Sequence, residues 1–401
     1  NALKPPVTFP MDPPPAFVFL VSIYTGALFG GAITAVLINT PGSPAAVATT
    51  LDGYPMTRKG ESGRALGLAV GSSSMGGIIG ALVLLLIIQP LATVALKFGP
   101  TEMFIVAVFG LTIIASIQDG GFIKAMYAGL FGVLLGTIGM TDTGAMRVTF
   151  GNIYLLDGIP MIPALIGLFA ISELFFLAEK SFVAKNTEEK GLPLALIGGI
   201  KESFTQPFNT LRSSLIGVFV GALPAAGSTV ASLLSYNEAR RFSKNKDEFG
   251  KGCKDGIIAS ENANNASEGG ALATMLVLGI PGSASTAMLL GAIIMQGWVP
   301  GPRLFIEQST VIYGIIFSIL IGLIFLILIG GVVSLGAGYI INTPTRILIP
   351  IIMVFALIGA FATRNLLFDA LLVFLFGILG WYLRRNQYPV MAVVLGLILG
   401  P

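Results

Sequence analysis

Helix-breaking residues interrupt three apolar stretches of this 401-residue chain, at 39–43, 224–229 and 279–286. Proline removes a backbone donor and glycine frees the backbone to turn, so a helix is expected to stop at each place. A helix that restarts there has unpaired N–H groups and about half a positive charge at its new N-terminus. Such an N-terminus binds an anion without a basic side chain, and the hydroxyl groups of neighbouring serine and threonine residues add donors.

We therefore predict a substrate site at these interruptions, together with two amides that precede the third. The predicted substrate-binding residues are Asn39, Thr40, Pro41, Gly42, Ser43, Pro224, Ala225, Ala226, Gly227, Ser228, Thr229, Asn264, Asn265, Gly279, Pro281, Gly282, Ser283, Ser285 and Thr286. The alternative is a purely structural role, in which the proline and glycine kinks only shape the helices.

The polar run at 261–268 precedes the third interruption and places several amides and carboxylates close together. Buried amides need hydrogen-bond partners. An acid at membrane depth is costly, so its presence there indicates a function. The candidates for binding a coupling ion, Na⁺ or H⁺, are Glu261, Asn262, Glu268 and Thr25. A capping cluster at the membrane surface is the rival interpretation of this run.

The composition predicts an all-α polytopic membrane protein, because 54% of residues are hydrophobic and only 11% are charged, against roughly a quarter charged in soluble domains. A span needs about 20 apolar residues. Continuous spans are expected near 16–38, 65–89, 102–118, 121–140, 160–178, 311–333, 345–363, 366–383 and 389–400. With interrupted segments near 213–236 and 262–297, the total is about 11–12 membrane segments.

The residue types that are missing exclude most enzymes. The chain has no histidine and one cysteine, Cys253, which removes Ser-His and Cys-His nucleophile pairs, zinc-peptidase motifs and thiolate clusters. We therefore expect no enzyme activity, no cofactor and no resident metal, although a transported Na⁺ is compatible with the sequence. The net charge of +3 gives no reason to expect a nucleic-acid partner.

Two halves of the chain resemble each other at an offset near 240–245 residues. Gly30-Gly31-Ala32 followed by Pro41-Gly42-Ser43 matches Gly269-Gly270-Ala271 followed by Pro281-Gly282-Ser283. Pro100-Thr101 matches Pro344-Thr345, and 130–132 matches 375–377. We predict a first repeat at 1–180, an interfacial linker at 181–212 and a second repeat at 213–401. The repeat implies an N-terminal hairpin before residue 1 and a further span after residue 401.

Charge bias predicts the orientation. Loop 57–64 carries three basic residues against one acid, and loop 237–254 carries six against three, so both are expected in the cytoplasm. The repeat equivalents of these loops, 299–310 and 1–15, carry one basic and one acidic residue each. This opposite bias indicates inverted-topology halves with re-entrant helical hairpins. In addition, the glycine-serine cluster at 71–77 indicates close helix packing, and 194–211 is expected to form one interfacial amphipathic helix.

Three long segments carry a resemblance to a known family: NTPGSPAAVATTLDGYPMTRKGESGRALG, GALPAAGSTVASLLSYNEARRFSK and GGALATMLVLGIPGSASTAMLLGA. They resemble the signature segments of the large membrane subunit of tripartite tricarboxylate transporters, the TctA family, and the resemblance covers essentially the whole chain. It implies a multi-pass subunit in the bacterial inner membrane that works with a small membrane subunit and a periplasmic solute-binding protein. A dimer is also compatible with it.

The resemblance implies import of di- or tricarboxylates such as citrate, driven by an ion gradient. The alternatives are a passive anion channel and a stand-alone ion-coupled transporter for another organic anion. An intramembrane enzyme is disfavoured, because the chain has neither histidine nor a Gly-Asp dipeptide.

Overall fold

A computed structural model describes residues 11–39, 41–97, 101, 105, 121–140, 145–179, 192–224, 227–301, 304, 307–341 and 345–399. These residues are mostly helical, with one two-stranded antiparallel hairpin in which β1 (Gly139–Met140) pairs with β2 (Met146–Arg147). Five described helices are long and apolar enough to cross a membrane: α2 (Pro13–Ile38), α4 (Ser62–Ala95), α15 (Ser309–Ile341), α16 (Thr345–Arg364) and α17 (Leu367–Arg385). The prediction of an all-α polytopic membrane protein is confirmed to this extent.

The other helices are shorter. They are α3 (Val47–Arg58), α6 (Gly121–Gly136), α7 (Met161–Leu165), α8 (Ser172–Ala178), α9 (Leu192–Ser203), α10 (Pro207–Gly221), α11 (Gly227–Phe242), α12 (Lys254–Leu278), α13 (Ala284–Met295) and α18 (Val390–Leu399). Single turns occur at η1 (Pro44–Ala46), η2 (Ile153–Leu155) and η4 (Lys246–Glu248), and a π-helical stretch, η3 (Ile166–Ile171), joins α7 to α8. The span predicted at 102–118 lies outside the described residues.

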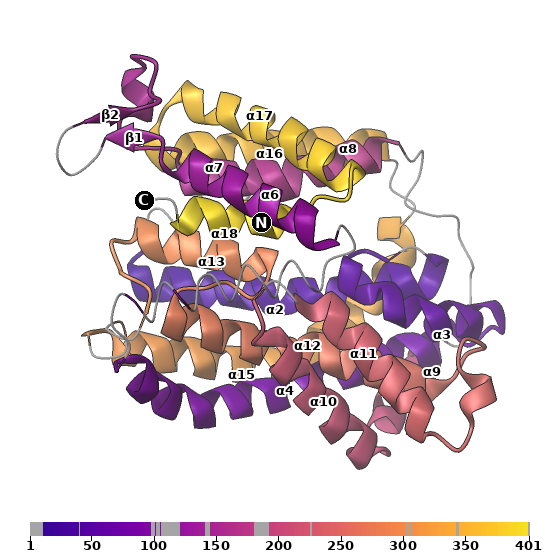
Figure 1. The fold of residues 1–401 in the computed structure, drawn as a ribbon. Coiled ribbons are helices and arrows are strands. Elements are labelled where there is room, and N and C mark those ends of the chain that lie inside the picture. Colours follow the sequence, from indigo (N-terminus) through magenta and orange to yellow (C-terminus); the bar gives the residue numbers. More distant parts are fainter. Residues whose placement is uncertain are drawn as a thin grey trace.

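Figure 1 shows two groups of helices. One group contains α2, α3, α4, α9 to α12 and α15, and the other contains α6 to α8 and α16 to α18. Helix α13 lies between the groups, where Ile280 and Ala287 join a buried apolar cluster with Ala164, Leu165 and Leu168.

Helix α12 is the centre of the first group, because nearly every residue from Gly256 to Val277 is buried. Its neighbours approach closely at glycines. A Cβ atom at Gly76 of α4 would lie 2.5 Å from the Cα atom of Asn262, and a Cβ atom at Gly217 of α10 would lie 2.5 Å from the Ala263 carbonyl oxygen. Small residues permit such backbone contact between membrane helices. The packing role predicted for 71–77 is therefore confirmed at Gly76.

The second group contains two similar glycine crossings. Gly132 of α6 faces the Val393 backbone of α18, and Gly396 of α18 faces the Gly129 carbonyl oxygen of α6. At the other crossing, Gly377 of α17 faces Ile171 and Gly167 of η3 faces the Val373 carbonyl oxygen of α17. Gly132 and Gly377, which the sequence analysis predicts to be equivalent, each lie at one of these two crossings.

Two predictions about local structure need correction. Residues 194–211 form not one helix but parts of α9 and α10, which meet at 204–206 because Pro207 begins a new helix. Helix α9 packs on α4, where a Cβ atom at Gly67 would overlap the Leu196 carbonyl oxygen. The span predicted at 160–178 is not a continuous α-helix, since the π-helical stretch lies within it.

Candidate functional site

The third interruption is a sharp break between α12 and α13. Gly279 ends α12 in the left-handed conformation (φ 70°), with its N–H donating to the Met275 carbonyl oxygen. Ser283 caps α13: its Oγ accepts from the Thr286 N–H, and Thr286 Oγ1 accepts from the Ser283 N–H at 2.8 Å. Pro281 and Gly282 are buried, while Ser285 is half-buried. The Ser283 and Thr286 hydroxyls therefore cap the helix in this state, an arrangement that fixes the new N-terminus.

The second interruption lies against the third. A Cβ atom at Gly282 would lie 2.6 Å from the Gly221 carbonyl oxygen at the end of α10. Gly227, which begins α11 with φ 61°, has the Gly282 carbonyl oxygen 3.8 Å from its ideal Cβ position. Pro224 is buried, and Ser228 and Thr229 are half-buried in the first turn of α11. The predicted residues Ala225 and Ala226 lie outside the described part of the chain.

The first interruption folds back on its own helix. Asn39 ends α2 with φ 55°, and the Gly42 N–H donates to the Gly31 carbonyl oxygen at 3.2 Å. A Cβ atom at Gly31 would lie 2.5 Å from Ser43 Oγ, a buried atom without a hydrogen-bond partner in the described structure. Pro41 and Gly42 are exposed. Thr40 lies outside the described residues.

Helix α11 connects the first interruption to the second. Its Ser232 Oγ donates to the Ala45 carbonyl oxygen at 2.9 Å and also approaches the Ser228 carbonyl oxygen at 2.5 Å. The structure thus brings the second and third interruptions together directly, and it holds the first beside α11.

The polar run of α12 is buried inside the bundle, which contradicts the alternative of a capping cluster at the membrane surface. Asn262, Asn264 and Asn265 are fully buried, and the Oδ1 atom of each lacks a partner among the described residues. Glu261 accepts from Thr49 Oγ1 and from Ser73 Oγ, the latter at 2.7 Å.

Glu268 lies two turns further along α12 and is 2% exposed. Its Oε1 atom accepts from Thr25 Oγ1 on α2 at 2.9 Å. Thr25 and Glu268, two of the candidates for binding a coupling ion, therefore lie together. Tyr24, the neighbour of Thr25, lies beside both Glu268 and Ser283 and so connects the polar run to the third interruption.

Sequence analysis missed three polar partners of this region: Thr49, Ser73 and Tyr24. Ser73 belongs to the glycine-serine cluster at 71–77, for which the sequence favours helix packing over ligand contact. Packing is observed at Gly76, where the Asn262 backbone leaves no room for a side chain, and Gly77 packs against the Leu323 side chain. A serine cluster on a helix is a signal for a polar partner, but the sequence does not say which acid it meets.

None of the three interruptions contains a lysine or arginine. The arrangement therefore offers an anion main-chain N–H groups, the N-terminal ends of α11 and α13, and hydroxyl groups. Along its whole length the chain matches one protein family, the tripartite tricarboxylate transporter TctA family, over residues 2–395. The chain belongs to the TctA family.

Two proteins of Agrobacterium vitis resemble this TctA-family chain. It is 36% identical over 406 residues to an uncharacterized 52.8 kDa protein in the TAR-I ttuC' 3' region, covering 100% of this chain and 80% of that protein. It is 37% identical over 186 residues to an uncharacterized protein in the TAR-II ttuC' 3' region, covering 46% of this chain and 76% of that protein. No solved structure matches the chain.

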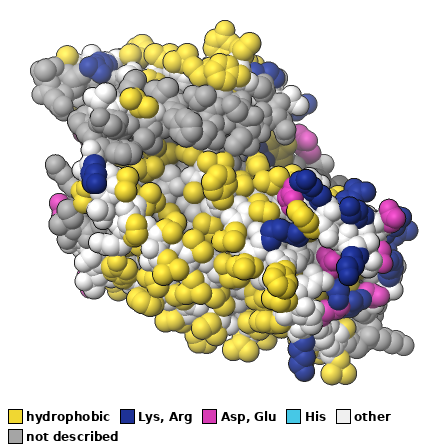
Figure 2. Space-filling view, turned by 60° about the horizontal axis from the view of Figure 1, so that its bottom comes forward, with side chains coloured by type: hydrophobic (Ala, Val, Ile, Leu, Met, Phe, Trp, Pro, Cys, Tyr) yellow, Lys and Arg dark blue, Asp and Glu magenta, His cyan; other side chains and the backbone are white. Residues whose placement is uncertain are grey.

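Membership in a tripartite transporter family means that this TctA-family chain is a multi-pass transport protein that works with partner subunits and a solute-binding protein. The two basic loops, 57–64 and 237–254, lie together at one end of the molecule. Lys59 Nζ donates to the Lys251 carbonyl oxygen at 2.7 Å. Figure 2 shows charged side chains gathered at this end and an apolar surface over the adjoining bundle.

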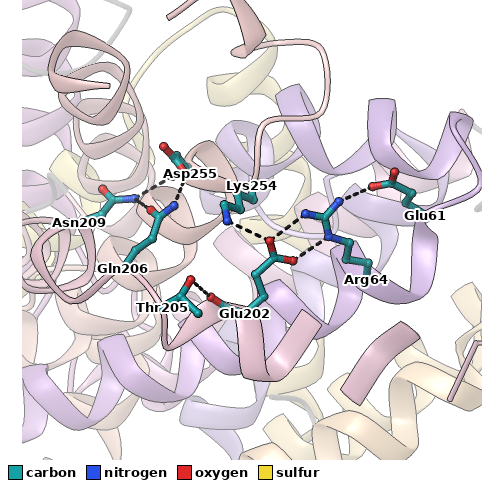
Figure 3. A network of polar contacts seen from close by, with 8 residues as sticks. All are labelled: Glu61, Arg64, Glu202, Thr205, Gln206, Asn209, Lys254 and Asp255. Carbon is teal, nitrogen blue, oxygen red and sulfur yellow. Dashed lines mark hydrogen bonds and ion pairs between the residues drawn. The ribbon is translucent and has the colours of Figure 1, made fainter. Parts of the chain in front are cut away.

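An ion-pair network at this end joins α4, α9 and α12 (Figure 3). Glu202 pairs with Arg64 through two bonds of 2.7 and 2.8 Å and with Lys254 Nζ at 3.0 Å, and Arg64 also pairs with Glu61 at 2.8 Å. Arg64, aided by Lys254, lowers the pKa of the Glu202 carboxyl to about 2. The pairs therefore persist throughout the neutral pH range.

Asp52 binds the second basic loop of this TctA-family chain to helix α3. Its fully buried carboxylate accepts from the N–H groups of Gly250, Gly252 and Cys253, each at 2.8 Å, and from the Tyr236 hydroxyl, also at 2.8 Å. Burial raises the pKa of the Cys253 thiol to about 11, so this thiol stays protonated and unreactive. Asp52 thus links α3, α11 and the start of α12.

Proposed function

We propose that the chain is the large transmembrane subunit of a binding-protein-dependent secondary transporter that imports di- or tricarboxylates, such as citrate, with an ion gradient. The observation that carries this proposal is the meeting of the second and third interruptions, where Gly282 packs on Gly221 and faces Gly227. Two helix N-termini, those of α11 and α13, begin beside this contact. A carboxylate placed there would accept main-chain N–H bonds from both.

We infer that the first and third interruptions are equivalent parts of two inverted repeats. Gly42 packs on Gly31, eleven residues earlier, and Gly282 packs on Ala271, also eleven residues earlier. The two pairs are related by an offset of 240 residues. Gly132 of α6 and Gly377 of α17, which are 245 residues apart, each lie at a close helix crossing, as equivalent positions would. In this proposal the hairpins form the mobile unit, and helices such as α15 form the scaffold.

Because the substrate is an anion, its import must be coupled to the movement of another ion. Each net negative charge carried inward against 100 mV costs roughly 2.3 kcal/mol, so a di- or trianion meets about 5–7 kcal/mol from the potential alone. Co-transported Na⁺ or H⁺ must exceed the anion charge for the potential to assist uptake. We place the transporter in the bacterial inner membrane with loops 57–64 and 237–254 in the cytoplasm, and with a small membrane subunit and a periplasmic solute-binding protein as partners.

Two adjacent glycines on α2 provide a matched test. A Cβ atom at Gly31 would press on Ser43 at 2.5 Å, whereas a Cβ atom at Gly30 has no atom within 4 Å. A displacement of about 1 Å at a reacting site can cost about 10²-fold. In liposomes that contain all subunits, Gly31→Ala should therefore lower the initial rate of labelled citrate uptake by about 10- to 100-fold, while Gly30→Ala should match the parent protein.

Equal uptake by the two alanine variants would count against a substrate site at the first interruption. Uptake by the parent protein that rises linearly with citrate concentration and needs no ion gradient would instead indicate a passive channel. Substrate specificity is tested in the same vesicles with unlabelled di- and tricarboxylates as competitors.

A further inference from the structure

Glu268 is a buried carboxylate, and only one of its two oxygens accepts a hydrogen bond from the described residues. Thr25 donates to Oε1, while Oε2 is buried without a partner among the described residues. A buried carboxylate that is ionised and unpaired is strongly unfavourable. The unused oxygen therefore indicates either a bound cation or a proton.

Glu261 lies on the same face of α12, but both of its oxygens accept hydrogen bonds. Thr49 donates to one of its oxygens and Ser73 donates to the other. Donation to both oxygens favours the charged form of a carboxylate. The two acids thus differ in their hydrogen bonds: both oxygens of Glu261 accept one, whereas Oε2 of Glu268 accepts none from the described residues.

The surroundings of Glu268 fit a proton better than a metal cation. Its carboxyl borders a gap between α4, α12 and α15 that is too narrow for a water molecule and is lined by Ala81, Leu84, Leu272, Ile319 and glycines. A sodium ion requires several oxygen ligands at once, and these side chains supply none. A proton on Oε2 needs no space and removes the charge.

No described lysine or arginine pairs with Glu268. The titratable and polar groups that face it come from α2, where Thr25 donates to it and Tyr24 lies beside it. The faces of α4 and α15 that border the gap are apolar, and Glu261 is the other acid on this face of α12. A proton on Oε2 would therefore neutralise Glu268 where no described basic side chain does.

We propose that Glu268 carries a coupling proton of this transporter, an inference that rests on the proposed carboxylate import. A proton from the outer aqueous phase binds Oε2 when the hairpins are open to that side, and the neutral carboxylic acid crosses with the substrate. The O–H bond breaks and the proton leaves to water on the cytoplasmic side. Tyr24, which lies beside both Glu268 and Ser283, places this event next to the substrate site.

The test uses proteoliposomes that contain all subunits, without sodium, and with the membrane potential clamped at zero by potassium and valinomycin. A gradient of one pH unit is worth about a tenfold accumulation for each proton carried. The parent protein should accumulate labelled citrate in response to this gradient. Glu268→Gln, which fixes an uncharged side chain, should lose this accumulation about tenfold and should still exchange labelled for unlabelled citrate.

One control and a second variant keep the test decisive. Glu307→Gln, at an exposed acid, should behave as the parent protein. If Glu268→Gln does not assemble with its partner subunits, Glu268→Asp decides, because it retains a titratable group and should accumulate citrate with a shifted pH midpoint. An unchanged pH dependence in Glu268→Asp would overturn the proposal.

Three other results would also overturn it: gradient-driven accumulation by an assembled Glu268→Gln protein, loss of exchange together with accumulation in that protein, or parent uptake that follows a sodium gradient and ignores pH. None of these three results would contradict the proposed function, carboxylate import. If the parent protein neither exchanges nor accumulates any carboxylate, the proposed function fails and this inference falls with it.

Discussion

Replacing Asp52 with alanine is expected to destabilise the protein by about 2–4 kcal/mol. The carboxylate of Asp52 accepts from three backbone N–H groups and the Tyr236 hydroxyl. Alanine removes this acceptor and leaves the Cys253 N–H buried without a partner, and an unsatisfied buried donor costs about 1–3 kcal/mol. Thermal unfolding of the assembled transporter in detergent measures the loss.

Graded variants identify the mechanism of this loss. Asp52→Asn keeps an acceptor for the three N–H groups but loses the charge, so its cost should be intermediate, since charge-assisted bonds are about twice as strong as neutral ones. Tyr236→Phe removes one hydroxyl donor and should cost about 1 kcal/mol. Asp247→Ala, at an exposed acid of the same loop, should cost nothing measurable. If Asp52→Ala is no less stable than Asp247→Ala, Asp52 does not fasten the loop.

The second large effect is expected at the crossing of α4 and α12. Valine at Gly76 would place a branched side chain where even a Cβ atom lies 2.5 Å from the Asn262 Cα atom. Overpacking usually costs about 1–3 kcal/mol, and here the obstacle is helix backbone that cannot rotate away. Gly76→Val should therefore yield little assembled protein, as measured by fluorescence-detected size-exclusion chromatography.

Gly322→Val is the matched control for the crossing. Gly322 lies on α15 with no atom within 4 Å of its ideal Cβ position. This variant changes helix propensity by the same amount and fills no occupied space, so it should assemble as the parent protein does. A normal yield of Gly76→Val would show that α4 and α12 do not pack as described.

Local signals predicted the helix ends well. The interruptions at 39–43, 224–227 and 279–283 all separate helices, because proline and glycine act on the backbone within a few residues of themselves. Pro207 carried an equally local signal for the start of α10, which the prediction of one amphipathic helix overlooked.

Long-range contacts could not be predicted in the same way. Ser73 meets Glu261 across 188 residues of sequence, and Asp52 meets Cys253 across 201 residues. Nothing within either sequence segment specifies its partner. The π-helical stretch at Ile166–Ile171 belongs to this class as well, since Gly167 lies where α17 leaves no room for a side chain.

The most direct test of the account is a structure of the transporter with its partner subunits in saturating citrate. The account predicts a carboxylate within hydrogen-bond distance of main-chain N–H groups in the first turns of α11 and α13, with no lysine or arginine side chain in contact with it. A citrate molecule that is held by a basic side chain elsewhere, with these helix N-termini empty, would contradict the account.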